Sequence, residues 1–162
     1  MKIDRIVTIN IKNNDIESVR RIFKKEIDSK NIIIIERLKA KKISKKSIRN
    51  YLIPGGTLDR SAIDDLIESD KLSETIKISK DRFRKLQLEW SAESTLSDFE
   101  IALEKTIISE KLGLFNRSVL SIGVVLGFLL LKEEELNNLR KIAKAKEFNI
   151  PEDEVKRMLV VA

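Results

Sequence analysis

Residues 14–38 read NDIESVRRIFKKEIDSKNIIIIERL, and their apolar side chains recur at intervals of three and four residues. This spacing places them on one face of a helix. The four isoleucines Ile32–Ile35 alone would favour a strand, because β-branched side chains fit extended backbone well. The helical spacing around them extends over more than twenty residues, so we predict that the helix runs through the isoleucines. Asn14 and Glu17 have the spacing of a capping box and mark its beginning.

The remainder of the chain repeats this pattern in shorter segments, and only five glycines and two prolines interrupt it. Residues 1–11 fit both helical and strand spacing, and we assign them to a helix because the rest of the chain is helical. Ser44 is placed to cap a helix that reaches Leu52, and Leu52–Thr57, which contains Pro-Gly-Gly, ends it. The predicted fold is therefore all-α, a bundle of about eight helices. The later helices are expected at Leu58–Ile67, Leu72–Trp90, Thr95 or Ser97 to Leu112, Asn116–Leu131, Glu133–Glu147 and Pro151–Leu159.

Composition narrows the classes of function. The 162 residues contain no histidine and no cysteine, which excludes disulfides, thiolate nucleophiles, and imidazole or thiolate metal sites. Histidine is also the commonest general base near neutral pH, so we expect a protein that is not an enzyme. The net charge of +6 suits an acidic protein partner, an anionic membrane surface or nucleic acid. The longest apolar segment, Val119–Leu131, is too short to span a bilayer and no secretory signal opens the chain, so we expect a soluble, cytoplasmic protein.

One segment of the chain recurs after 107 residues without a gap, because residues 28–53 align with residues 135–160. Both have an acidic residue, an asparagine, a basic pair two positions apart, a break at Ile-Ser or Ile-Pro, and a second helix. We interpret this as a duplicated helix–turn–helix unit. The first unit, at 1–57, is incomplete, the second is at 58–162, and together they form one continuous helical domain. The identical pairs are Asn31 and Asn138, Ile35 and Ile142, Lys39 and Lys146, Ile43 and Ile150, and Leu52 and Leu159.

The polar residues of the repeat are the candidate site. On one helix, Arg37 points about 120° from Asn31 on one side, and Lys39 about 80° on the other. These three side chains therefore cannot converge on one ligand. Two interpretations stay open: the asparagine packs helices while the basic pair is solvated, or the residues make polar contacts between helices or subunits.

The C-terminal part of the chain carries a more specific pattern. It reads KEEELNNLRKIAKAK at 132–146, followed by Ile150-Pro151 and by VKRML at 155–159. This resembles the C-terminal signature of the C subunit of the archaeal and vacuolar-type rotary ATPases, known as the d subunit in the eukaryotic vacuolar enzymes. That family typically ends in a Lys-Glu-x-Glu-x-x-Asn-Leu-Arg helix, a basic stretch, and a short helix with a leucine near its end. The matching residues are Glu133, Glu135, Asn138, Leu139, Arg140, Ile142 and Lys146, and the segment from Asp28 to Gly56 resembles an earlier part of the family pattern.

The resemblance implies a fold and a role. The family fold is an all-α funnel of three related helical units on the cytoplasmic face of the membrane proteolipid ring, peripheral to the membrane, and it forms a socket for the central stalk. It binds no nucleotide or other cofactor and has no small-molecule substrate. It transmits rotation between ATP synthesis or hydrolysis and ion transport, so the expected partners are the proteolipid ring and the central-stalk subunits. The candidate residues for polar contacts or for docking to other subunits are Asn31, Arg37, Lys39, Asn138, Arg140, Lys144 and Lys146.

The chain departs from the family pattern in two respects. Family members are much longer and hold three helical units, whereas this chain holds two, and we interpret it as a truncated rather than a split form. Family members often have glycine near the positions of Ala145 and Asn149, and this chain has none there, which puts the local turn in question.

The basic run Lys39–Arg49 supports a rival hypothesis, because it holds six positive charges in eleven residues. It could contact nucleic-acid phosphates, acidic protein loops or anionic lipid, or form a solvated face. The single tryptophan and the single tyrosine do not interleave with it for base stacking, which disfavours a nucleic-acid-binding module. Pro54–Thr57 precedes a helix, as phosphate-binding loops do, but lacks the spacing and the lysine of a P-loop, so we interpret it as a turn.

Overall fold

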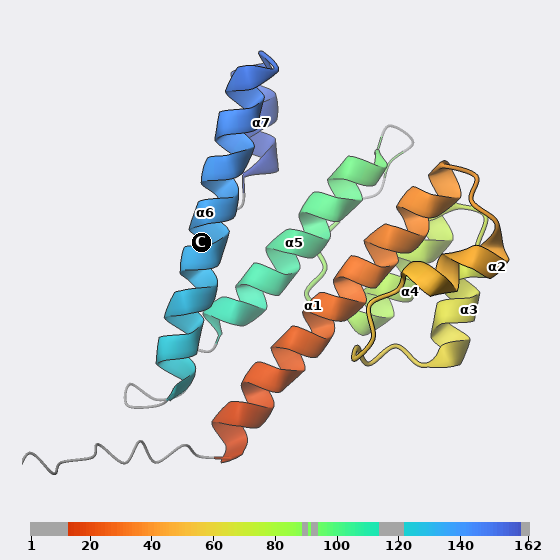
Figure 1. The fold of residues 1–162 in the computed structure, drawn as a ribbon, viewed down its shortest axis with the longest axis horizontal. Helices are drawn as coiled ribbons and strands as arrows, with labels where there is room; N and C mark the ends of the chain where they lie inside the picture. Colours follow the sequence, from red (N-terminus) through yellow and green to blue (C-terminus); the bar gives the residue numbers. More distant parts are fainter. Residues whose placement is uncertain (1–12, 89–90, 92–93, 114–121, 160–162) are drawn as a thin grey trace, which may run out of the picture.

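The computed structural model describes residues 13–88, 91, 94–113 and 122–159, and these residues form α-helices and one 3₁₀ helix without any strand (Figure 1). The all-α prediction is therefore confirmed. The helix predicted in residues 1–11 lies outside the described residues, as does the start predicted at Asn116. The elements are α1 (Asn13–Ala40), α2 (Lys45–Ile48), η1 (Arg49–Tyr51), α3 (Arg60–Glu68), α4 (Leu72–Arg82), α5 (Leu96–Leu112), α6 (Ile122–Glu147) and α7 (Glu152–Met158).

The longest helix, α1, runs through the isoleucines as predicted. Ile32 and Ile35 are fully buried, with 0% of their surface exposed. A buried isoleucine contributes about 2 kcal/mol through removal of its surface from water, which exceeds the small propensity penalty of a β-branched residue in a helix. Packing of the apolar face thus decides the conformation of this segment.

Two elements are shorter than predicted. α2 gives way to η1, so Leu52, which we placed in the helix, lies in extended backbone with φ −77° and ψ 142°. α4 ends at Arg82, whereas the prediction continued it towards Trp90. Phe83 and Leu86 keep the helical spacing, but they are buried from the turn that follows the helix. Apolar periodicity alone does not show whether a buried side chain lies on a helix or on the turn that follows it.

The boundaries of α5 and α6 resolve two further predictions. α5 starts with a capping box in which Asp98 N–H donates to Thr95 Oγ1 and Thr95 N–H donates to the Asp98 carboxylate. Of the two predicted starts, Thr95 is therefore right and Ser97 is wrong. The segments predicted as two helices on either side of Lys132 belong to a single helix, because Glu133–Glu135 continue α6 and do not begin a new helix.

The three long helices, α1, α5 and α6, contact one another pairwise (Figure 1). The shorter elements α2, α3 and α4 cover the C-terminal half of α1, and α7 folds back along the C-terminal part of α6. A smaller apolar cluster joins α1 to α6 through Val19, Ile22 and Leu130. The main core joins α1 to α5 with the shorter elements, and its most buried members are Ile32, Ile35, Ile48, Leu66, Phe83, Phe99 and Leu103.

A buried lysine ties the long helices together by charge. Lys111 of α5 has no exposed surface, and its Nζ lies 2.9 Å from Glu134 of α6 and 3.3 Å from Glu26 of α1. Burial disfavours the charged form of Lys111, but the hydrogen bond to Glu134 and the charge of Glu26 outweigh burial and raise its pKa. The charged lysine is therefore matched by one carboxylate from each neighbouring helix.

Candidate functional site

The predicted site residue Asn31 is buried on α1 and holds the loop that follows η1. Its Nδ2 donates to the carbonyl oxygen of Ile53 at 2.9 Å, and the N–H of Ile53 donates to its Oδ1 at 2.8 Å. One side chain thus satisfies both backbone groups of a residue that no helix or strand would pair. Asn31 therefore holds a loop against α1, which is neither the helix packing nor the contact with another subunit that the sequence left open.

Asp28, one turn before Asn31, holds the next part of the same loop, although it was not among the predicted site residues. Its buried carboxylate accepts from Thr57 N–H at 2.7 Å, from Thr57 Oγ1 at 2.5 Å and from Leu58 N–H at 3.0 Å. The two N–H groups are backbone donors of the kind that a phosphate uses at a loop before a helix. Because Asp28 already occupies them, Pro54–Thr57 acts as an internally closed turn in this structure.

Gly56 is the residue that lets this carboxylate approach the backbone. A Cβ at position 56 would lie 2.1 Å from Asp28 Oδ1, which is far inside van der Waals contact. The neighbouring Gly55 has φ +99°, a conformation that side chains strongly disfavour. A side chain is therefore disfavoured at both positions, by its backbone conformation at Gly55 and by the contact with Asp28 at Gly56.

Arg37 and Lys39 contact two different helices. Arg37 Nε and NH2 donate to the two carboxylate oxygens of Glu100 on α5, at 2.7 and 2.6 Å. Lys39 Nζ donates to the carbonyl oxygen of Leu66 at 3.1 Å and to Ser69 Oγ at 3.0 Å, where α3 ends. Together with Asn31, these residues tie α1 to three separate parts of the fold and do not converge on one point.

The other four predicted site residues lie on α6. Asn138 is half-buried, while Arg140, Lys144 and Lys146 are exposed. Arg140 donates to Asn137 Oδ1 at 3.2 Å on its own helix. The side chains of Lys144 and Lys146 make no hydrogen bond or ion pair with any residue that the structure describes. The basic residues of the second segment are thus available for contacts, unlike Arg37 and Lys39 in the first.

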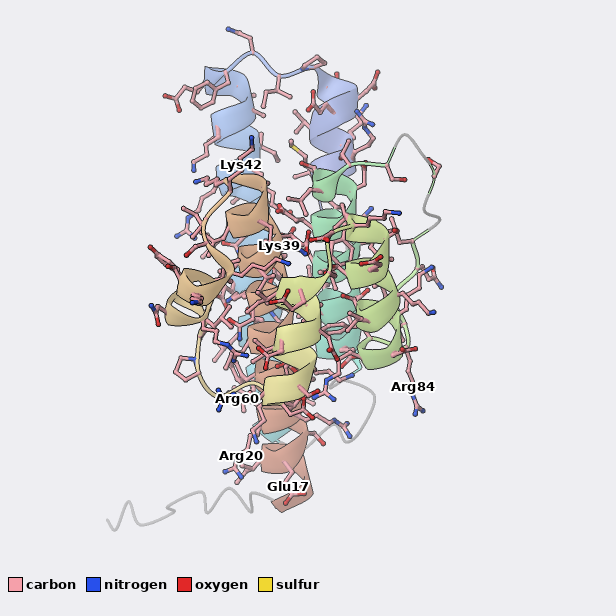
Figure 2. All side chains as sticks on the ribbon, turned by 90° about the vertical axis from the view of Figure 1, so that its right-hand side faces the viewer. Glu17, Arg20, Lys39, Lys42, Arg60 and Arg84 are labelled. Carbon is pink, nitrogen blue, oxygen red and sulfur yellow. The ribbon has the colours of Figure 1, made fainter. Side chains whose placement is uncertain are left out.

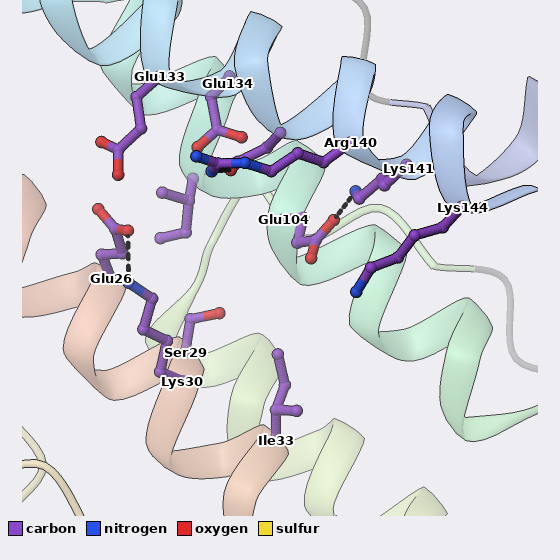
Figure 3. A pocket seen from close by; sticks show the side chains of 12 residues that line it. Glu26, Ser29, Lys30, Ile33, Glu104, Glu133, Glu134, Arg140, Lys141 and Lys144 are labelled. Atoms are coloured by element: carbon purple, nitrogen blue, oxygen red, sulfur yellow. Dashed lines mark hydrogen bonds and ion pairs between the residues drawn. The ribbon is translucent and has the colours of Figure 1, made fainter.

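A cleft of about 350 Å³ lies between α1, α5 and α6 (Figure 3). Within it, Lys30 pairs with Glu26 and Lys141 pairs with Glu104. Arg140 and Lys144 reach into the cleft without a carboxylate partner among the described residues. No cluster of three or more potential metal ligands of the Asp, Glu, His or Cys type occurs in the described part of the chain. The remaining lining residues are Ser29, Ile33, Ile107, Glu133, Glu134 and Asn137.

Much of the basic run is engaged within the protein. Lys39 contacts α3 as described above, Lys45 pairs with Glu68 and Asp70, and Arg49 pairs with Asp64. Lys42 lies free at the end of α1 (Figure 2), and Lys41 and Lys46 are likewise exposed without partners among the described residues. Half of the positive charge that suggested a nucleic-acid surface is therefore already neutralised.

Both helix–turn–helix segments pass through the same turn. Lys42 and Asn149, 107 positions apart, have left-handed backbone with φ of 57° and 52°. The N–H of the next residue donates to the carbonyl oxygen five residues before it, at 3.0 Å in the first segment and 2.9 Å in the second. The residues at the N-caps of the following helices, Ser44 and Pro151, also have similar φ and ψ, −59° and 135° against −57° and 143°. This agreement of backbone geometry supports our proposal that the unit is duplicated.

Comparison with known sequences places these features in a family. A sequence model of the ATP synthase (C/AC39) subunit matches residues 3–158. The chain belongs to the ATP synthase (C/AC39) subunit family. The match covers both helix–turn–helix segments, the loop that Asp28 and Asn31 hold, and the α6 residues that line the cleft.

Individual relatives share about a third of their aligned residues with this chain. The A-type ATP synthase C subunit of Pyrococcus abyssi is 31% identical over 137 residues, which are 82% of this chain and 37% of that protein. The C subunit of Thermococcus kodakarensis is 32% identical over 139 residues, 82% of this chain and 36% of that protein. The C subunit of Methanosphaera stadtmanae is 27% identical over 146 residues, 83% of this chain and 37% of that protein. The chain thus spans little more than a third of the length of these relatives, and no solved structure shows a significant match.

Proposed function

We propose that this chain is a non-catalytic coupling element of an A-type rotary ATP synthase, which links the membrane proteolipid ring to the central stalk. The observation that carries the proposal is the family match over residues 3–158, together with relatives named as the C subunit of A-type ATP synthases. A coupler must transmit torque as a stiff body, and the polar contacts of the described residues suit that task. Asn31, Asp28 and Lys111 each bind groups from other elements and so join the helices into one unit.

Arg140 and Lys144 are our candidates for the docking contact. They stand four positions apart on α6, so they lie one turn apart on the same side of the helix. Both line the cleft and have no carboxylate partner among the described residues. Charged groups at an interface steer association and set orientation, and they lose that effect as salt screens them. The expected partner surface is acidic and belongs to the central stalk or to the loops of the ring.

The position of the protein in the cell follows from the same proposal. In the described residues, no helix combines the length and the apolar character needed to cross a membrane. The proposed coupling role itself places the chain on the cytoplasmic face, peripheral to the membrane and held there through other subunits. No cofactor and no small-molecule substrate belongs to this role.

Co-sedimentation tests the proposal against the nucleic-acid alternative. The chain is mixed with membranes that contain the proteolipid ring and, separately, with purified central stalk, each challenged with excess duplex DNA and with added salt. We expect saturable binding that DNA does not displace and that salt weakens only in part. Binding that DNA abolishes would favour a nucleic-acid-binding module, and absence of binding to both rotor components would reject the coupling role.

A further inference from the structure

One face of α6 is apolar and exposed, although the same face of α1 is buried. Leu136 and Leu139 each expose 55% of their surface, whereas Ile32, which stands 107 positions before Leu139, exposes 0%. The face comprises five exposed residues, which we name the α6 stripe: Glu135, Leu136, Leu139, Ala143 and Lys146. Their counterparts on α1 are buried, or half-buried in the case of the lysine: Asp28, Ser29, Ile32, Glu36 and Lys39.

In the first segment, α3, α4 and the loop before them cover the corresponding face. Leu66 of α3 and Ile76 of α4 belong to the same apolar core as Ile32. Lys39 donates to the carbonyl oxygen of Leu66 in the last turn of α3, and Asp28 accepts from two backbone N–H groups of the loop. The first segment therefore shows what kind of element completes this unit, which is a loop followed by two amphipathic helices.

In the second segment, none of the described residues takes those places. Lys146 has no partner among them, and Glu135 accepts only from Lys132 on its own helix. The side of α6 that packs inward is the opposite one, where Leu130 contacts α1 and Lys141 pairs with α5. The exposed leucines are thus not buried by any of the residues that the structure describes.

We propose that the α6 stripe is the docking site of two amphipathic helices that lie outside residues 1–162 and pack on α6 as α3 and α4 pack on α1. The first helix ends over Lys146, which donates to a carbonyl oxygen of its last turn, as Lys39 does at α3. Glu135 accepts from backbone N–H groups of the loop that leads into the pair. Leu136 and Leu139 enter the apolar contact that Ile32 makes in the first segment.

A helical pair fits this face better than a second copy of the chain. In a second copy, α3 and α4 already cover their own α1 and α2, so they are not free to bind elsewhere. The family also contains enough additional sequence, because the chain spans only 37% of the Pyrococcus abyssi relative. These helices would cover the second helix–turn–helix segment, and the proposal does not depend on the coupling role.

The test extends the full chain after Ala162 with a copy of its own residues 56–88, which places that copy at the same 107-residue offset. Amide hydrogen exchange is then measured over residues 135–158. We expect exchange in this region to slow by about tenfold or more relative to a chain extended with the same residues in scrambled order, because a docked pair suppresses local opening of α6 and α7. The tether supplies a high effective concentration, so weak docking is detectable.

Matched variants show whether the protection comes from the α6 stripe. In the extended chain, Leu139→Asp should abolish the protection, whereas Val125→Asp should retain it, because Val125 has the same 55% exposure but lies about 21 Å away along α6. Lys146→Glu should reduce it more than Lys105→Glu, which alters an exposed lysine of α5. Absence of protection, or protection that Leu139→Asp leaves intact, would overturn the proposal. Dimerisation of the unextended chain that Leu139→Asp abolishes would overturn it too, because the occupant would then be a second copy.

Discussion

Lys42 and Asn149 lie in two turns of similar geometry, and both have left-handed backbone, with φ of 57° and 52°. In each case the residue ends a long helix, and the turn pairs the last carbonyl groups of that helix with the next N–H groups. The sequence lacks the glycine that such turns usually contain, and asparagine and lysine adopt the conformation in its place. The turn at Asn149 that the missing glycine put in question therefore forms.

Lys42→Gly should stabilise the protein. Left-handed backbone costs a residue with a side chain about 1–2 kcal/mol, and glycine avoids this cost but loses about 0.5–1 kcal/mol of chain entropy on folding. We expect the free energy of unfolding in urea to rise by about 0.5–1 kcal/mol. Asn149→Gly should gain less, because asparagine tolerates this conformation. Lys46→Gly, inside α2, is the control and should lower stability; a loss of stability in Lys42→Gly would contradict the assignment of the turn.

Gly56→Ala should destabilise the protein, because the new Cβ would meet Asp28 Oδ1 at 2.1 Å. The carboxylate or the loop must move, and overpacking of this kind costs about 1–3 kcal/mol. Thermal unfolding followed by circular dichroism measures the loss. Gly113→Ala serves as the matched control, since its φ of −61° suits alanine and its Cβ would meet the carbonyl oxygen of Glu110 at 3.2 Å, which requires a shift of only a few tenths of an ångström. Equal melting temperatures for both variants would show that the contact with Asp28 is not close.

Asn31→Ala should lower stability by about 1–3 kcal/mol. The substitution removes two partly buried hydrogen bonds, to the N–H and to the carbonyl oxygen of Ile53, and each contributes about 0.5–1.5 kcal/mol. The free energy of unfolding in urea measures this loss. Asn50→Ala removes an exposed amide from η1 and should change stability by less than about 0.5 kcal/mol. If the two substitutions had the same effect, Asn31 would not hold the loop.

Stability should fall in acid because of the ion pairs around Lys111. Burial alone would raise the pKa of Glu26, but its hydrogen bond with Lys30 and the charge of Lys111 lower it below the ordinary value of 4.5. The contribution of Glu26 is therefore present above that ordinary value and is lost as pH falls through the lowered pKa. The raised pKa of Lys111 acts at the other end of the range, since its contribution is present below the ordinary value of 10.5 and is lost as pH rises through the raised value.

Urea unfolding between neutral pH and about pH 3 measures how the free energy of unfolding falls with pH, which we call the acid limb of the stability profile. Glu26→Gln should flatten this limb relative to the wild type, because a glutamine does not titrate. Glu17→Gln, an exposed position on the same helix, should leave the limb unchanged. An acid limb of identical depth in all three proteins would mean that Glu26 does not contribute.

Helical spacing predicted the presence and order of nearly every described helix, because the longer helices each place apolar side chains against a core. It was wrong where an apolar residue reaches the core from a turn, as Phe83 and Leu86 do after α4. It was also wrong about a break at Glu133, where acidic residues suited a first helical turn but α6 simply continues. The division into units at residues 1–57 and 58–162 remains a prediction. The main core includes Ile48 from one side of that boundary and Leu66 from the other.

The contacts of the candidate site residues were harder to predict from the sequence, because the residues that they bind lie far away along the chain. The repeat pattern pointed to Asn31, and Asp28 stands at the acidic position of the same pattern. The spacing of residues did not show that the N–H groups of Thr57 and Leu58 would donate to Asp28. Lys111 carried no signal, since a lysine in an amphipathic helix is usually solvated and only the arrangement of three helices buries this one.

The most direct test of the coupling role is the dissociation constant of the chain for purified central stalk, measured by isothermal titration calorimetry. The wild type is compared with Arg140→Glu/Lys144→Glu and with Lys77→Glu/Lys105→Glu, which has the same charge change at exposed lysines of α4 and α5. The coupling account predicts that the wild type binds, that the α6 variant binds about tenfold more weakly or worse, and that the control stays near the wild type. A wild type that does not bind the stalk, or two variants that weaken binding equally, would contradict it.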